Sequence, residues 1–183
     1  MIWITSDLHL QHDKPFMYEA RGFSSIQEHD EAIIKNWNKL VADYDVVYIL
    51  GDLIMGESEQ GIELLRQLNG SLKIILGNHC TAKRIELYKT LPNVEVLGYA
   101  NILKYQKYSF YLSHYPTLCS NFNDGKTLKE KIINLCGHTH TKDCFADIDK
   151  GMIFHVEMDT NNCKPWKLDD IICTLKSKEG EMQ

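Results

Sequence analysis

The chain has 183 residues, of which 44% are hydrophobic and 25% charged, proportions typical of a soluble globular protein with one sizeable core. Its net charge of −5 argues against a broad basic surface, so we expect no long nucleic acid as partner. No apolar run approaches the roughly 18 to 20 residues that span a bilayer, so we expect no membrane partner. The six cysteines form no C-x-x-C pair and the N-terminus shows no export signal, so we expect a cytoplasmic protein with reduced thiols.

The first half of the chain alternates predicted strands and helices. Short apolar runs rich in β-branched residues predict strands at 3–6, 45–50 and 72–76. Helical spacing of apolar residues predicts helices at 26–41, 59–68 and 81–91. Ser25 is the expected N-cap of the first helix, with Glu28 completing a capping box. Residues 9–25 show no helical period, which predicts a long loop at the rim of a site.

The second half consists mainly of predicted strands, at 94–97, 102–105, 109–113 and 132–136. A polar turn is predicted at 121–126, and further strands or short helices at 152–158 and 171–175. We expect one domain over residues 1–176, followed by a polar, frayed tail over 177–183. The alternating half predicts a mainly parallel sheet covered by helices, and the later strands predict a second sheet packed on it. The fold class is therefore α/β.

Five short polar motifs follow apolar runs and carry the candidate chemistry. They are Asp7-Leu8-His9, Gly51-Asp52, Gly77-Asn78-His79, His114 and Gly137-His138-Thr139-His140. Ligands of open α/β sheets bind beyond the carboxyl ends of strands, which is where these motifs lie. Their two Asp, one Asn and five His are enough for two divalent cations, with one His left over as an acid. Together the motifs indicate a two-metal hydrolase of phosphate esters.

The spacing within two motifs suggests how they bind. Asp7 and His9 are two residues apart, so on an extended strand both side chains would point the same way and hold one cation. His138 and His140 have the same spacing and are candidates to serve different cations.

The two glycine-containing turns supply oxygen ligands. Gly51 and Gly77 would let the chain pass close to the cations. Asp52 has two carboxylate oxygens and is the candidate bridge, while Asn78 offers an amide oxygen. This mixture of oxygen and nitrogen suits Mn²⁺, our expected cation, with Fe, Zn²⁺, Mg²⁺ and Ni²⁺ as alternatives. The absence of thiolate at these positions argues against a structural zinc site.

This order of motifs resembles that of the calcineurin-like metallophosphoesterases, whose pattern is D-x-H, G-D, G-N-H-[D/E], H and G-H-x-H. The resemblance covers residues 1–159 and is closest to small single-domain bacterial and phage members. It implies a two-sheet α/β sandwich flanked by helices. It also implies one cation held by Asp7, His9, Asp52 and His140. The resemblance implies a second cation held by Asp52, Asn78, His114 and His138.

The resemblance also implies a catalytic role for His79, which would not bind metal. It would donate to a phosphate oxygen or protonate the leaving group while a metal-bridging hydroxide attacks phosphorus in line. The expected substrate is a small phosphomonoester or phosphodiester, and no substrate-binding residues are assigned. Two alternatives stay open: a nuclease, and a catalytically weak scaffold or binding module on the same fold.

One position departs from the family pattern. Cys80 stands where the family has Asp or Glu after G-N-H. A neutral thiol cannot orient the catalytic imidazole as a carboxylate does, so we expect a weakened general acid and an intact metal site.

Other residues near the motifs have two interpretations each. His12 could touch substrate, whereas His29 is expected to be a solvated or capping side chain, and His155 a structural one. Arg84 could bind a second phosphate or pair with Glu86. The tyrosine-rich segment 99–115 could stack on nucleotides, but half-buried sheet tyrosines are the preferred interpretation.

Overall fold

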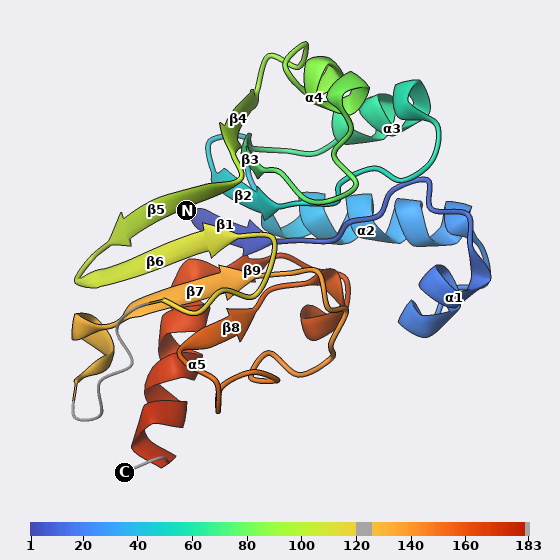
Figure 1. Cartoon of the computed structure of the whole chain (residues 1–183). Coiled ribbons are helices and arrows are strands. Elements are labelled where there is room, and N and C mark those ends of the chain that lie inside the picture. The colour runs from blue at the N-terminus through green and yellow to red at the C-terminus, as the bar shows by residue number, and fades with distance from the viewer. Residues whose placement is uncertain (120–125, 182–183) are drawn as a thin grey trace.

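The computed structural model describes residues 1–119 and 126–181, which form two β-sheets with helices around them (Figure 1). The five-stranded sheet has the order β4 (Val94–Gly98), β3 (Ser71–Ile75), β2 (Val46–Leu50), β1 (Ile2–Thr5) and β9 (Trp166–Lys167). Strands β1 to β4 are parallel, and β9 runs antiparallel to β1. The first half of the chain thus forms the parallel sheet that its alternating pattern predicts.

The second sheet comprises β5 (Ala100–Tyr105), β6 (Tyr108–Ser113), β7 (Ile132–Cys136) and β8 (Ile153–His155) in that order. Strands β5 and β6 form an antiparallel hairpin, whereas β6, β7 and β8 are parallel. Figure 1 shows the arrows of β1, β6 and β7 pointing to the same side of the molecule. The loops that follow strands of both sheets therefore meet at one edge.

Neighbouring residues of the first sheet face two different cores because side chains alternate along a strand. Trp3, Ile49 and Ile74 pack against the helices α2 (Ile26–Leu40), α3 (Ser58–Leu65) and α4 (Ala82–Tyr88). Their neighbours Ile4, Leu50 and Ile75 pack with the second sheet and with helix α5 (Leu168–Glu181). The result is the predicted two-sheet sandwich flanked by helices. No helix in the described part of the chain is long and apolar enough to cross a membrane.

Two segments differ from the sequence-based predictions, and a third cannot be compared with them. The predicted loop 9–25 contains a short helix, α1 (Pro15–Tyr18), followed by the 3₁₀ turn η1 (Glu19–Arg21). Proline at the first helical position and left-handed Gly22 after the last one delimit this segment, which is too short to show a period. Helix α5 includes 171–175 and continues to Glu181, through most of the predicted tail. The predicted turn at 121–126 lies almost wholly outside the described residues.

The remaining predicted elements lie close to their expected positions. Helix α2 begins after Ser25, whose side chain accepts the N–H of Glu28. The Glu28 carboxylate in turn accepts the backbone N–H of Ser24. In the 152–158 segment, only β8 is a strand, and the 3₁₀ turn η3 (Met158–Asn161) follows it.

Candidate metal centre

The loops after β1, β2 and β7 hold five candidate ligands in the left-handed backbone conformation. These residues, with φ between 51° and 77°, are Asp7, His9, Asp52, His138 and His140. Non-glycine residues rarely adopt this conformation, which costs about 1 to 3 kcal/mol each and concentrates at functional sites. The extended strand predicted for Asp7 and His9 is therefore wrong, since β1 ends at Thr5. Left-handed turns, and not the pleat of a strand, aim both side chains inward.

The first group of converging ligand atoms comes from Asp7, His9 and His140. Oδ1 of Asp7 lies 3.5 Å from Nε2 of His9 and 3.6 Å from Nε2 of His140. Asp7 and His9 are buried, and Oδ1 of Asp7 and Nε2 of His9 have no hydrogen-bond partner among the described residues. Buried polar atoms without partners are costly, and a cation between them would remove that cost. The residues present thus fit a divalent cation at this point.

The second group comes from Asp7, Asp52 and His114. Nε2 of His114 lies 3.3 Å from Oδ2 of Asp52 and 2.8 Å from Oδ1 of Asn78. Nδ1 of His114 lies 2.8 Å from the Leu50 carbonyl, which can only accept, so Nδ1 carries a proton. In the neutral imidazole, Nε2 then offers a lone pair beside the Asn78 oxygen. A cation bound to both would satisfy these two acceptors.

Asp52 sits in strongly polar surroundings. Burial disfavours its ionisation, but the protonated form of the His114 ring and the backbone N–H of His79 outweigh burial and hold the pKa of Asp52 at about 2. The carboxylate is therefore charged at neutral pH and available to cations. Asp7, however, is the residue common to both converging groups, whereas the sequence pointed to Asp52 as the bridge.

The remaining candidates lie at the edge of the two groups. The His138 ring is 5.0 Å from the His114 ring and 4.6 Å from the Tyr115 ring, and its side chain belongs to neither converging group. Its backbone N–H donates to Oδ2 of Asp7. Nε2 of His79 lies 4.0 Å from Oδ2 of Asp52, and 42% of the His79 side chain is exposed. His79 thus borders the centre and stays accessible to a substrate.

Two positions require glycine because neighbouring atoms lie very close to the backbone there, as the sequence suggested. Gly51 has φ of 94°, and a Cβ there would collide with the His114 ring. A Cβ at Gly77 would collide with the Asp52 carboxylate and lie 2.9 Å from its backbone nitrogen. Any side chain at either position would displace a candidate ligand.

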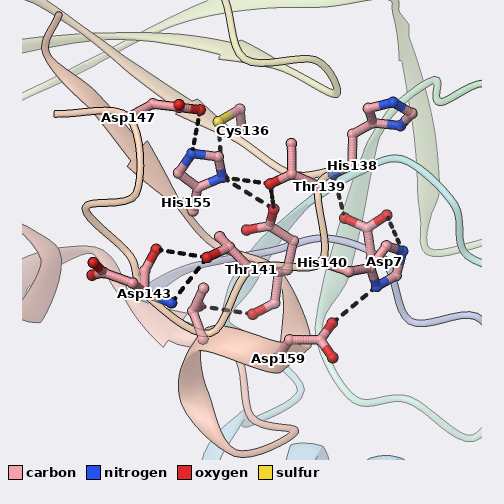
Figure 2. A network of polar contacts seen from close by, with 12 residues as sticks. Asp7, Cys136, His138, Thr139, His140, Thr141, Asp143, Asp147, His155 and Asp159 are labelled. Atoms are coloured by element: carbon pink, nitrogen blue, oxygen red, sulfur yellow. Dashed lines mark hydrogen bonds and ion pairs between the residues drawn. The ribbon is translucent and has the colours of Figure 1, made fainter. Parts of the chain in front are cut away.

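Arg21 and Asp159 hold candidate ligands in position through hydrogen bonds, although neither residue belongs to one of the five motifs. The Arg21 side chain is 1% exposed, and its Nε and Nη2 donate to the two carboxylate oxygens of Asp159 at 3.1 and 2.7 Å. It also donates to the carbonyls of Asp7 and Leu8. Asp159 in turn accepts Nδ1–H of His140 at 3.1 Å, which leaves Nε2 of His140 for a cation (Figure 2).

His29 completes this arrangement, and the prediction of a solvated or capping side chain is wrong. It is fully buried, with Nδ1 2.8 Å from the Asp30 carboxylate and Nε2 2.9 Å from Nη1 of Arg21. Arg21 is only a donor, so Nε2 of His29 accepts and Nδ1 donates. With this bond all five guanidinium N–H groups of Arg21 have acceptors.

We expect Arg21→Lys to weaken Mn²⁺ binding about 10- to 100-fold and to lower the free energy of unfolding by about 3 kcal/mol. A lysine keeps the charge but offers three donors in another geometry, so buried acceptors lose their partners. Calorimetric Mn²⁺ titration and urea unfolding measure the two effects. Arg66→Lys is the matched control, since the Arg66 side chain is 46% exposed. Unchanged Mn²⁺ affinity in Arg21→Lys would contradict this positioning role.

A second buried network anchors the loop that carries His138 and His140 (Figure 2). Between them, Thr139 donates to Oε1 of Glu157, which lies 3.1 Å from Nδ1 of buried His155. Nε2 of His155 lies 3.0 Å from Asp147. Burial disfavours the imidazolium, but the two carboxylates outweigh it and raise the pKa of His155. His155 is thus structural, as its sequence position suggested.

The Arg84 guanidinium faces the backbone of two loops. It donates to the backbone carbonyls of His79, Met55 and Gly56 at 2.7 to 3.0 Å. These bonds tie the loop after β2 to the loop after β3, and among the described residues Arg84 forms no ion pair with Glu86, whose partner is Lys89. The Cys80 side chain also points into the protein. Its thiol accepts the N–H of Gly77 and packs against the core that the first sheet forms with helices α2, α3 and α4.

A pocket of about 500 Å³ opens beside the centre. Four imidazole rings line it, together with Lys142, Asp159 and an apolar wall from the α1 region and the loop after β2. The rings are those of His9, His12, His79 and His140. His12 thus lines the pocket, with Nδ1 3.3 Å from Nδ1 of His9, and its contact with a substrate stays a prediction.

The chain is similar to known proteins over most of its length. The calcineurin-like phosphoesterase superfamily domain model matches residues 1–156. An uncharacterised protein of Methanocaldococcus jannaschii is 33% identical over 177 residues, covering 93% of this chain and 89% of that protein. The gene 66 protein of Mycobacterium phage D29 is 29% identical over 180 residues, covering 86% of this chain and 87% of its own.

A solved structure has the same fold. It is a protein of unknown function from Aquifex aeolicus, which superposes with a TM-score of 0.71 at 19% sequence identity. The match covers 95% of this chain and 98% of that one. The two-sheet architecture is thus shared over nearly the whole length of both proteins.

Proposed function

Because the chain belongs to the calcineurin-like phosphoesterase superfamily, we propose that it is a hydrolase of small phosphomonoesters or phosphodiesters that uses two divalent cations. The observation that carries this proposal is the convergence of Asp7, His9 and His140 with Asp7, Asp52 and His114. Two adjoining groups of carboxylate and imidazole ligands, all of them buried except the half-buried His140, are what a pair of cations requires. Mn²⁺ is the expected cation, with Fe, Zn²⁺, Mg²⁺ and Ni²⁺ as alternatives. We also propose that the protein is located in the cytoplasm.

When bound, the cations would lower the pKa of a nucleophilic water and offset the negative charge of the phosphate oxygens. Asp7, His9 and His140 would hold one cation, and Asn78, His114 and His138 the other, and Asp52 would supply a carboxylate to both.

His79 is the residue in position to handle a proton. It borders both the centre and the pocket and keeps nearly half of its side chain exposed. In its protonated form it would donate from the imidazole to the ester oxygen as the bond to phosphorus breaks. Nε2 of His79 lies 4.0 Å from Oδ2 of Asp52, which places the ring at the edge of the ligand groups.

The alternatives make different predictions. A scaffold would bind the cations but hydrolyse nothing, and the completeness of the candidate ligand set speaks against it. A nuclease needs a basic surface for its polymer, which the net charge of −5 does not favour.

The test is hydrolysis of bis(p-nitrophenyl) phosphate and p-nitrophenyl phosphate with and without added Mn²⁺, alongside a DNA digest. We expect Mn²⁺-dependent release of p-nitrophenol from at least one ester and no DNA cleavage. Bound metal without turnover of either ester would favour the scaffold, and efficient DNA cleavage would favour the nuclease.

Cys80→Asp tests whether the unusual residue weakens His79. We expect a higher kcat with unchanged metal content, because a carboxylate next to His79 would favour the imidazolium. Burial raises the pKa of the Cys80 thiol, which therefore supplies no charge at neutral pH. Unaltered kcat would show that this side chain, which faces Gly77, has no influence on the acid.

A further inference from the structure

The pocket beside the centre has two chemically different sides. One side carries the imidazoles of His79 and His140, close to the converging ligand groups. The other side is apolar and consists of Phe16, Met17 and Ala20 from the α1–η1 segment and Met55 from the loop after β2. A phosphate ester has the same division, since a charged phosphorus centre is joined to an organic group.

The apolar side has an exposed aromatic ring at its edge. Phe16 is 70% exposed, whereas Met17 beside it is 7% exposed and anchors α1 to the protein. The His12 ring meets Phe16 edge to face, with centroids 5.6 Å apart and planes at 88°. An exposed phenylalanine with such a neighbour offers both a face and an edge to a second aromatic ring.

The charged side chains that line the pocket limit the kinds of ligand that it can bind. Lys142 is the one lysine or arginine that lines it, and it forms no ion pair within the described ranges 1–119 and 126–181. Asp159 is paired with Arg21, and the Arg84 guanidinium faces backbone carbonyls outside the pocket. Such a pocket does not suit a chain of several phosphates, which would require more than one cationic side chain.

We propose that this pocket binds the organic group of the substrate, and that this group is aromatic. The inference rests on the proposed hydrolase function and names the substrate class of the same site: phosphate esters of aromatic alcohols or with aromatic substituents. The ring would lie between Phe16 and Met55, with His79 next to the ester oxygen. Lys142 would contact the anionic or polar edge of the ligand and contribute equally to aromatic and aliphatic esters.

The test compares two anions whose P–C bonds cannot be hydrolysed, diphenylphosphinate and dimethylphosphinate, by calorimetric titration of the Mn²⁺-loaded protein. We expect diphenylphosphinate to bind at least about tenfold more tightly, because its rings remove apolar surface from water. Phe16→Ala and Met55→Ala should each reduce this ratio to about threefold or less. Lys142→Ala should weaken both ligands and leave the ratio unchanged.

Tyr99→Ala is the matched control, since Tyr99 is an aromatic residue that is 72% exposed and does not line the pocket. It should keep the wild-type ratio. Equal affinities for the two phosphinates, in a protein that hydrolyses bis(p-nitrophenyl) phosphate, would overturn the aromatic pocket and leave the hydrolase. Aromatic preference that depends on Phe16, without any turnover, would support the pocket and overturn the hydrolase. Absence of both binding and turnover would overturn both.

Discussion

Asp52→Asn should lower bound metal from about two ions per chain to well under one and reduce kcat/KM by on the order of 10³-fold. The carboxylate lies between His114 and His79, and its pKa of about 2 keeps it charged at neutral pH. The amide keeps the shape but offers one neutral oxygen, which is a poor bridge for two cations. Elemental analysis of the purified variant, with parallel kinetics, measures both effects.

Two further variants make this test sharper. Asp43→Asn removes an exposed carboxylate away from the centre and should bind metal like the wild type. Asp7→Asn tests whether Asp7, in place of Asp52, is the ligand common to both cations, because Asp7 is the residue shared by both converging groups. Wild-type metal content in Asp52→Asn would contradict a ligand role. One retained ion in Asp52→Asn, with none in Asp7→Asn, would assign the bridge to Asp7.

His79→Ala should keep both metal ions and lose about 10²- to 10⁴-fold in kcat. The reason is that His79 borders the centre without joining either converging group, so its loss removes a proton donor and no ligand. The loss should be larger for a phenyl ester than for a p-nitrophenyl ester, since p-nitrophenolate leaves readily without a proton. Steady-state kinetics on the two esters, with metal analysis, provides the measurement.

The dependence on leaving group separates two roles of His79. An equal loss on both esters would indicate contact with a phosphate oxygen and exclude protonation of the leaving group. Loss of metal in His79→Ala would contradict the separation of His79 from the ligands altogether.

The parallel sheet and the places of the motifs were predictable because they depend on local patterns. Apolar, β-branched runs such as the one ending at Leu50 indicate buried strands, and such strands deliver their following loops to one edge. Gly51 and Gly77 were informative for the same reason, since a glycine before a polar residue indicates close approach of the backbone.

The left-handed conformations at Asp7 and His9 could not be predicted from local preference. Non-glycine residues disfavour this conformation, and it persists here because the loop is held from outside, by Arg21 at the Asp7 carbonyl and by Asp52 at the His9 N–H. Sequence pattern alone favours the extended alternative, which is the one we predicted.

Arg21 and Asp159 were missed because their partnership spans 138 residues and involves no motif. The available signal was indirect: Pro15 and Gly22 delimit a short helical segment that ends at Arg21. The pocket depends on the same segment, since α1 supplies Phe16 and Met17. The shape of the pocket depends on contacts between segments that are far apart in the sequence, and no periodic pattern of residues encodes such contacts.

The central claim is a two-cation hydrolytic centre, and the most direct test is the metal content of the wild-type protein purified without chelator and resupplied with Mn²⁺. About two ions per chain, removed by chelator together with hydrolysis of bis(p-nitrophenyl) phosphate and restored with it, is the predicted result. No bound metal under any condition, or hydrolysis that persists unchanged in the metal-free protein, would contradict the account.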